Sequence, residues 1–191
     1  LLSVMPAKNT TMTLAFATGA CGSENWGGVP AASMIAANLQ NFVQAGKYYI
    51  ISTGGAGGTF TCSSSSGFLA FVQSYYTSHM LGVDFDIEGG QTQSQITSLV
   101  QDVVTAESAY PSLRFSFTIA TEGGNASPSL NSTGVSVMDA IKSVGLTKYT
   151  INLMTMDYGS AIPGNCVVNN GACEMGSSAA QAAVDLHNQY G

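Results

Sequence analysis

The chain has 191 residues, of which 45% are hydrophobic and only 8% are charged, and its net charge is −6. This length suits one domain with a core of its own, and no stretch approaches the roughly 20 apolar residues of a membrane helix. The five Lys and Arg residues form no basic stripe, which argues against nucleic acid as a partner, whereas a neutral polymer such as a polysaccharide needs no attraction by charge.

Short apolar runs alternate along the chain with longer segments of helical spacing. We expect strands over 12–18, 48–53, 82–88, 113–120 and 149–156, and helices over 31–45, 67–78, 92–109, 136–144 and 177–188. Strands that alternate with helices in this way form parallel sheets with right-handed crossovers. An open doubly wound sheet and part of an eightfold barrel both fit this pattern, and periodicity does not decide between them.

The middle strand carries acidic residues at alternate positions. Asp84, Asp86 and Glu88 share one face of the strand, because successive side chains point to opposite sides, and the apolar residues between them take the other face. We expect the apolar face to pack under the helices and the acids to line the interior of the barrel or a crevice of the sheet. Burying neighbouring carboxylates without cations raises the pKa of at least one of them, which a general acid requires at neutral pH.

Two structural explanations compete with catalysis for this row. The acids could pair with buried Lys or Arg, although the whole chain has only five basic residues. They could also bind Mg²⁺ or Ca²⁺, because carboxylate oxygens suit hard cations. We assign the row to catalysis and expect neither a metal nor another cofactor.

The four cysteines are an even set with three possible pairings. Cys166 and Cys173 bracket a loop rich in Gly and Asn, which favours a Cys166–Cys173 bond and, with it, Cys21–Cys62. A zinc site and free thiols are the alternatives, although the spacing matches no zinc finger. Disulfides, low charge and loops rich in Ser, Thr and Asn indicate a secreted, extracellular protein. The opening residues 1–6 are too short for a signal peptide, so we expect any targeting segment to lie outside this sequence.

The acidic strand resembles the signature of a known family. Residues 81–88 are similar to the Asp-Gly-x-Asp-x-Asp-x-Glu motif of family 18 glycoside hydrolases, the chitinases and their relatives, with Leu81 in place of the first acid. Residues 52–55, Ser-Thr-Gly-Gly, resemble the family's Ser-x-Gly-Gly at the end of the third barrel strand. Residues 152–159 resemble the sixth-strand motif that supplies a substrate-positioning tyrosine. Three motifs in the family's order, on successive strand ends, make the resemblance specific.

The resemblance implies an α/β fold, the (β/α)8 TIM barrel. The five expected strands then correspond to about strands two to six of the barrel, so residues 1–191 would be a single catalytic-domain fragment with an incomplete barrel. Activity and a monomeric state are expected of the complete barrel.

The resemblance also implies a mechanism, the retaining hydrolysis of β-1,4-N-acetylglucosamine linkages with chitin or chitooligosaccharides as partners. Glu88 would protonate the glycosidic oxygen and later deprotonate water, while the substrate's own 2-acetamido oxygen attacks the anomeric carbon. Asp86 would hydrogen-bond the acetamido N–H, and Asp84 would share a proton with Asp86. Tyr158 would donate its hydroxyl to the acetamido oxygen.

Further residues are expected to bind the sugar. They are Met154, Met156, Asp157, Gly55 and Trp26. For Trp26, packing in the core is an equally good interpretation. Two other functions stay open: an endo-β-N-acetylglucosaminidase would use the same catalytic strand, and a chitin-binding lectin could use the same scaffold, although such lectins typically lack the glutamate or one of the acids.

Overall fold

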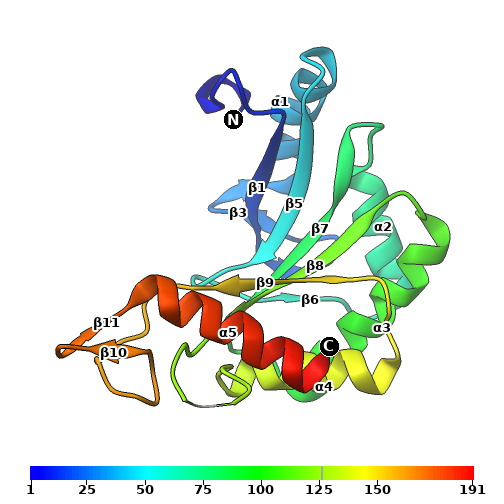
Figure 1. Ribbon diagram of the computed structural model, residues 1–191. Coiled ribbons are helices and arrows are strands. Elements are labelled where there is room, and N and C mark those ends of the chain that lie inside the picture. The colour runs from blue at the N-terminus through cyan, green and yellow to red at the C-terminus, as the bar shows by residue number, and fades with distance from the viewer. Residues whose placement is uncertain (126) are drawn as a thin grey trace.

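The computed structural model describes residues 1–125 and 127–191, and its centre is a parallel sheet with an α-helix after each strand (Figure 1). The strands of this sheet are β1 (Thr11–Ala17), β5 (Tyr48–Gly54), β7 (Met80–Ile87), β8 (Arg114–Ala120) and β9 (Thr150–Met154). The helices are α1 (Ala31–Gln44), α2 (Ser65–Tyr75), α3 (Gln93–Ala109), α4 (Ser132–Val144) and α5 (Met175–Tyr190). The alternation of strands and helices expected from the sequence is confirmed.

The order of the strands decides between the two architectures that periodicity left open. Across the sheet the order is β1-β5-β7-β8-β9, so each long strand lies beside the one before it in the chain. A doubly wound sheet reverses direction at a switch point, whereas a TIM barrel adds every strand on the same side. The fold is therefore an incomplete TIM barrel, and β1 and β9 form the two edges of its sheet.

Aromatic and branched residues join the sheet to the helices. On β7, Val83, Phe85 and Ile87 are at most 3% exposed. Phe85 stacks on Phe117 of β8, with ring centroids 5.3 Å apart, and its ring lies 5.8 Å from that of Phe68 on α2. This packing turns one face of β7 toward the helices. The alternate residues consequently lie on the opposite face, which is called the inner face below.

The ends of several elements differ from the expected ranges, those of β9 and α4 among them. β9 ends at Met154, so residues 155 and 156 lie in the loop that follows instead of in the strand. Helix α4 begins at Ser132, four residues earlier than expected, because the Asn131 side chain accepts a hydrogen bond of 2.8 Å from the N–H of Gly134 and caps the helix.

Short strands in the connecting loops were not expected from the sequence. The pairs are β2 (Gly19–Ala20) with β6 (Phe60–Thr61), β3 (Asn25–Trp26) with β4 (Val29–Pro30), and β10 (Val168–Asn169) with β11 (Ala172–Cys173). Each of them has two residues, which is too few for a periodic pattern. A single 3₁₀ turn, η1 (Leu2–Val4), precedes β1. Among the helices described, none is long and apolar enough to cross a membrane.

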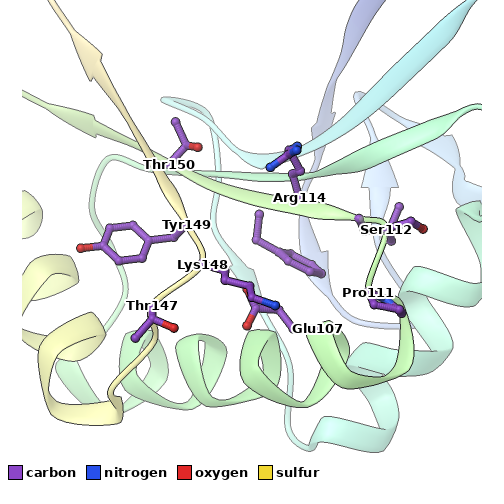
Figure 2. A pocket seen from close by; sticks show the side chains of 10 residues that line it. Glu107, Pro111, Ser112, Arg114, Thr147, Lys148, Tyr149 and Thr150 are labelled. Carbon is purple, nitrogen blue, oxygen red and sulfur yellow. The ribbon is translucent and has the colours of Figure 1, made fainter.

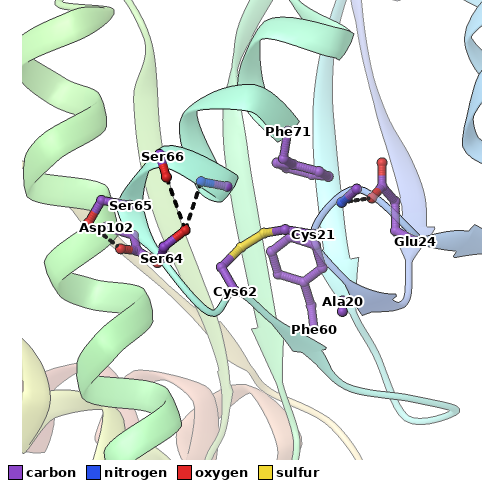
Figure 3. Close-up of a disulfide and its surroundings, with 12 residues drawn as sticks. Ala20, Cys21, Glu24, Phe60, Cys62, Ser64, Ser65, Ser66, Phe71 and Asp102 are labelled. Atoms are coloured by element: carbon purple, nitrogen blue, oxygen red, sulfur yellow. Dashed lines mark hydrogen bonds between the residues drawn. A yellow bond between two sulfur atoms is a disulfide. The ribbon is translucent and has the colours of Figure 1, made fainter.

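Both expected disulfides are present. Cys21–Cys62 joins the ends of β2 and β6, with the two Cα atoms 5.1 Å apart, and Figure 3 shows it beside the start of α2. There the Ser64 hydroxyl accepts a hydrogen bond of 3.1 Å from the N–H of Gly67 and caps the helix. Cys166–Cys173 closes a short loop before α5. The pairing favoured by the sequence is therefore confirmed.

A capping box begins α3, the helix that follows β7. The Thr92 hydroxyl accepts from the N–H of Gln95 at 3.2 Å, and the Gln95 side chain accepts from the N–H of Thr92 at 2.8 Å. We expect Thr92→Ala to lower the free energy of unfolding by about 1 kcal/mol, because it leaves an N–H of the first turn without its partner. Guanidinium denaturation measures the change. Ser98→Ala, at an exposed position of the same helix, is the control, and an equal loss in both variants would contradict the capping role.

Candidate active site

The acidic row lies at the carboxyl end of β7. Asp84 and Asp86 lie on the inner face and are each 7% exposed, and Glu88 follows the strand by one residue and is half-buried. In the register of the sheet, Asp84 pairs with Ser52 of β5 and with Ser116 of β8. The three acids therefore run from the middle of the sheet to its carboxyl edge, with Glu88 outermost.

Asp84 is held by hydrogen bonds from three neighbouring strands. The Ser52 hydroxyl of β5 donates to Oδ2 at 2.8 Å, and the Ser116 hydroxyl of β8 donates to Oδ1 at 2.6 Å. The Thr118 hydroxyl lies 2.9 Å from Oδ1 and 3.1 Å from Oδ2, and Nδ2 of Asn152 on β9 donates to Oδ1 at 3.1 Å. Both carboxylate oxygens thus have partners.

The donors on β8 were not among the expected site residues. β8 alternates strictly, with Phe115, Phe117 and Ile119 buried against the helices, so Ser116 and Thr118 lie on the inner face. The alternation is already visible in the sequence of 114–119, Arg-Phe-Ser-Phe-Thr-Ile. Combined with a parallel sheet, it could have placed both hydroxyls beside the acids.

Asp86 has a different environment on the same strand. Its Oδ1 atom is buried and has no hydrogen-bond partner. Burial, together with the nearby charges of Glu88 and Asp84, raises the pKa of Asp86 from 3.8 to about 6. The expectation that at least one carboxyl of the row has a raised pKa is confirmed, and that carboxyl belongs to Asp86.

The raised pKa of Asp86 predicts how stability depends on pH. Because the folded chain binds this proton more tightly than the unfolded chain, its contribution to stability is full below about 3.8 and is lost as the pH rises through about 6. Asn is neutral at every pH, so Asp86→Asn should stabilise the fold, relative to wild type, more at about pH 8 than at about pH 4.5.

Guanidinium denaturation of both proteins at the two pH values measures this difference. Asp139→Asn, at an exposed position of α4, is the control and should show no such dependence. A stability difference for Asp86→Asn that stays constant with pH would contradict the assigned pKa.

Two glycines bring β5 close to the backbone of Asp86. Gly54 has a φ of 87°, and a Cβ at this position would overlap the carbonyl oxygen of Asp86. The N–H of Gly55 donates to the same carbonyl at 3.0 Å, and a Cβ there would lie 2.8 Å from the ring of Phe16. Glycine alone combines this backbone conformation with such close contacts. Gly55 therefore positions Asp86, and its contact with a sugar stays a prediction.

The loop after β9 contains Tyr158. This residue is 7% exposed, and its hydroxyl is buried without a hydrogen-bond partner. An unpaired buried hydroxyl is unfavourable unless a ligand or a water supplies the partner. In the same segment Met154 ends the strand, Met156 is 53% exposed, and Asp157 is exposed with a left-handed φ of 54°. The roles of these residues stay predictions.

Trp26 belongs to the core and also to a cavity wall. It is 9% exposed, and its Nε1 donates to the Tyr75 hydroxyl at 2.8 Å, so the core interpretation is confirmed. It also lines a cavity of about 760 Å³ together with Phe16 and Gly54. The lining extends to Met34 and Ala37 of α1 and includes none of the three acids, although Gly54 pairs with Asp86 in the sheet. Stacking of Trp26 on a sugar stays a prediction.

A second cavity, of about 480 Å³, lies among residues at the amino ends of β8 and β9 (Figure 2). Its lining includes Arg114, Lys148 and Glu107 but no member of the acidic row. In TIM barrels the active site forms at the carboxyl ends of the strands, where the row lies. Within the described part of the chain, no group of three or more His, Cys, Asp or Glu side chains is placed to hold a metal ion.

Comparison with solved structures shows similar folds. The active domain 2 of chitinase from Pyrococcus furiosus, solved as catalytic-site mutants, matches with a TM-score of 0.69 and 21% identity over 95% of this chain and 56% of that chain. The C-terminal domain of ChiA from Legionella pneumophila matches with a TM-score of 0.51 and 21% identity over 80% of this chain and 52% of that chain. The solved structures that are similar to this chain therefore include a chitinase. No protein-family model and no curated protein matches the sequence.

At this level of identity the likeness shows the fold. It agrees with the strand order, since both point to an incomplete TIM barrel. The chain spans about half the length of the solved structures that it matches. The function of the acidic row is therefore argued below from its chemistry.

Proposed function

We propose that this chain carries the catalytic strand of a secreted, retaining endo-chitinase, which hydrolyses β-1,4 linkages between N-acetylglucosamine units. The row of Asp84, Asp86 and Glu88 at the carboxyl end of a buried barrel strand carries the proposal. The fold shared with the chitinase from Pyrococcus furiosus supports it, and the two disulfides support an extracellular location.

In the proposed reaction Glu88 is the general acid and base. Its carboxylic acid donates a proton to the glycosidic oxygen while the bond from that oxygen to the anomeric carbon breaks, and the departing sugar leaves as an alcohol. The 2-acetamido oxygen of the substrate forms the new bond to the anomeric carbon, giving an oxazolinium ion. Water then attacks the anomeric carbon, gives a proton to Glu88 and reopens the ring to the acetamide, so the configuration is retained.

Asp86 and Tyr158 offer the two polar groups that would orient the acetamido group. A carboxyl oxygen of Asp86 would accept from the acetamido N–H, and the Tyr158 hydroxyl would donate to the acetamido oxygen. Three buried side-chain polar atoms in the described part of the chain have no partner, and two of them are Asp86 Oδ1 and Tyr158 Oη. A ligand that binds to both residues would explain these unpaired atoms.

The cavity that Gly54 lines would give room for a sugar unit one strand away from the acidic row. Phe16 and Trp26 give it aromatic walls. Met156 and Asp157 follow β9 at the carboxyl edge of the same sheet and would border the sugar from the other side. Chitin and chitooligosaccharides, which are neutral, suit a chain with few charges.

Hydrolysis of a chromogenic chitotrioside by a complete barrel that contains this chain tests the proposal, with ¹H NMR recording which anomer is released first. We expect release of the chromophore and a product that starts in the β configuration. The matched cellotrioside should stay intact, because it has no acetamido group to act as nucleophile. A product of inverted configuration would contradict the mechanism. Binding of chitotriose without turnover would instead indicate a lectin, and cleavage of glycoprotein glycans alone an endo-β-N-acetylglucosaminidase.

A further inference from the structure

Neutral donors surround the carboxylate of Asp84. Its hydrogen bonds come from Ser52, Ser116, Thr118 and Asn152, at donor–acceptor distances of 2.6 to 3.1 Å. A carboxylate offers about four lone-pair positions, and these contacts occupy them on both oxygens. Because every donor is uncharged, the set stabilises the negative charge of Asp84 without cancelling it.

Asp86 lies next to Asp84 on the inner face but lacks this support. Its Oδ1 has no partner, and it stands between the negative charges of Asp84 and Glu88 along the strand. When two adjacent acids compete for one proton, the acid with fewer hydrogen bonds to its charged form takes it. The geometry therefore favours the proton on Asp86.

The other charged group on this face is an arginine. On β8, Arg114 shares the inner face with Ser116 and pairs in register with Gly82, two residues before Asp84. Its position in the strand therefore lies on the side of Asp84 that is remote from Asp86. The inner faces of the flanking strands carry residues without titratable side chains, namely Ile50, Ser52 and Gly54 on β5 and Thr150, Asn152 and Met154 on β9. Past the carboxyl ends of β8 and β9, the next titratable groups along the chain are Glu122, Asp157 and Tyr158.

We propose that Thr118 and Asn152 are positioning residues, which hold the negative charge on Asp84 and thereby assign the proton of the pair to Asp86. Nδ2 of Asn152 also lies 3.3 Å from the Thr118 hydroxyl, so the two side chains form one chain of hydrogen bonds from β9 to Asp84. The inference rests on the proposed function, in which Asp86 contacts the acetamido group. According to this inference, the proton resides on Asp86 and is not shared equally between Asp84 and Asp86.

A titration followed by ¹³C NMR tests the assignment without any substrate. The chain is labelled at the aspartate carboxyl carbons, and Asp84→Asn and Asp86→Asn identify the two resonances. In wild type, Asp86 should titrate with a midpoint of about 6. Thr118→Val keeps the shape of the side chain but removes a donor to Asp84. The midpoint of Asp86 should then fall by about 1 to 2 pH units.

Thr121→Val is the matched control, because the Thr121 hydroxyl is also partly buried, just past the carboxyl end of β8, but donates to the carbonyl of Met154 at 2.8 Å. In this control Asp86 should titrate as in wild type, and Thr118→Ser, which keeps the hydroxyl, should do the same. Asn152→Ala, at an exposed position of the edge strand, gives the same measurement if Thr118→Val does not fold.

An unchanged midpoint of Asp86 in both Thr118→Val and Asn152→Ala would overturn the inference. Failure of wild type to cleave or bind chitotriose would count against the proposed function and would leave the titration readable. The two failures can therefore be told apart.

Discussion

Replacement of Glu88 by Gln should lower kcat on a chromogenic chitotrioside by about 10²- to 10⁴-fold. Gln has the size of Glu, but it has no carboxylic proton to give to the glycosidic oxygen and takes none from water. Glu88 is half-buried and lies one residue beyond β7, so the substitution should leave the strand and its packing intact. Kinetics and near-UV circular dichroism of the two proteins measure both parts of this prediction.

Glu107→Gln is the matched control for this variant. Glu107 lies on α3 and lines the cavity at the amino ends of β8 and β9, away from the acidic row (Figure 2). Its replacement should leave turnover unchanged. Equal turnover by wild type and Glu88→Gln would remove Glu88 from its proposed role.

Asp86→Asn should lower kcat by about 10²-fold and leave the affinity for chitotriose nearly unchanged. The Asn side chain keeps a carbonyl oxygen that can accept from the acetamido N–H, so binding persists. It carries no negative charge, however, so above about pH 6, where the wild-type carboxyl is ionised, the positive oxazolinium ion loses the carboxylate beside it. Steady-state kinetics and calorimetric titration with chitotriose separate the two effects.

Asp102→Asn is the control for the loss of a buried carboxyl. Asp102 is 4% exposed and lies on α3, where its Oδ1 accepts a hydrogen bond of 2.6 Å from the Ser65 hydroxyl at the start of α2 (Figure 3). This variant should leave the turnover per folded molecule unchanged. A wild-type rate in Asp86→Asn, or a loss of binding as large as the loss of rate, would refute the role assigned to Asp86.

Together with the pH dependence of stability described above, this prediction means that the charged side chain of Asp86 supports activity but lowers the stability of the fold. The same substitution should stabilise the fold above about pH 6, because the wild-type carboxyl is ionised there in a buried position. It should at the same time remove most of the activity. A residue retained for packing alone would not show this combination.

Periodicity in the sequence was sufficient for the elements that bury one face. The residues between the acids of β7 are apolar, and the structure buries Val83, Phe85 and Ile87 against the helices as expected. Helix α3 likewise follows from the stripe that includes Ile96 and Val103. The boundaries predicted for α4 and β9 were wrong because they depend on contacts at the ends of these elements. Helix α4 starts at the cap on Asn131, and β9 ends where its pairing with β8 ends.

The alternation of side chains along β7 by itself determined that Asp84 and Asp86 share a face, since a strand has a period of two wherever it lies. Only the tertiary structure decided the strand order and the difference in hydrogen bonding between the carboxyl groups of Asp84 and Asp86. The donors to Asp84 come from residues 32 to 68 positions away along the chain, on β5, β8 and β9. These donors contact one carboxylate because the parallel pairing of the sheet brings strands together that are distant in the chain. The local sequence around Asp84 does not predict these contacts.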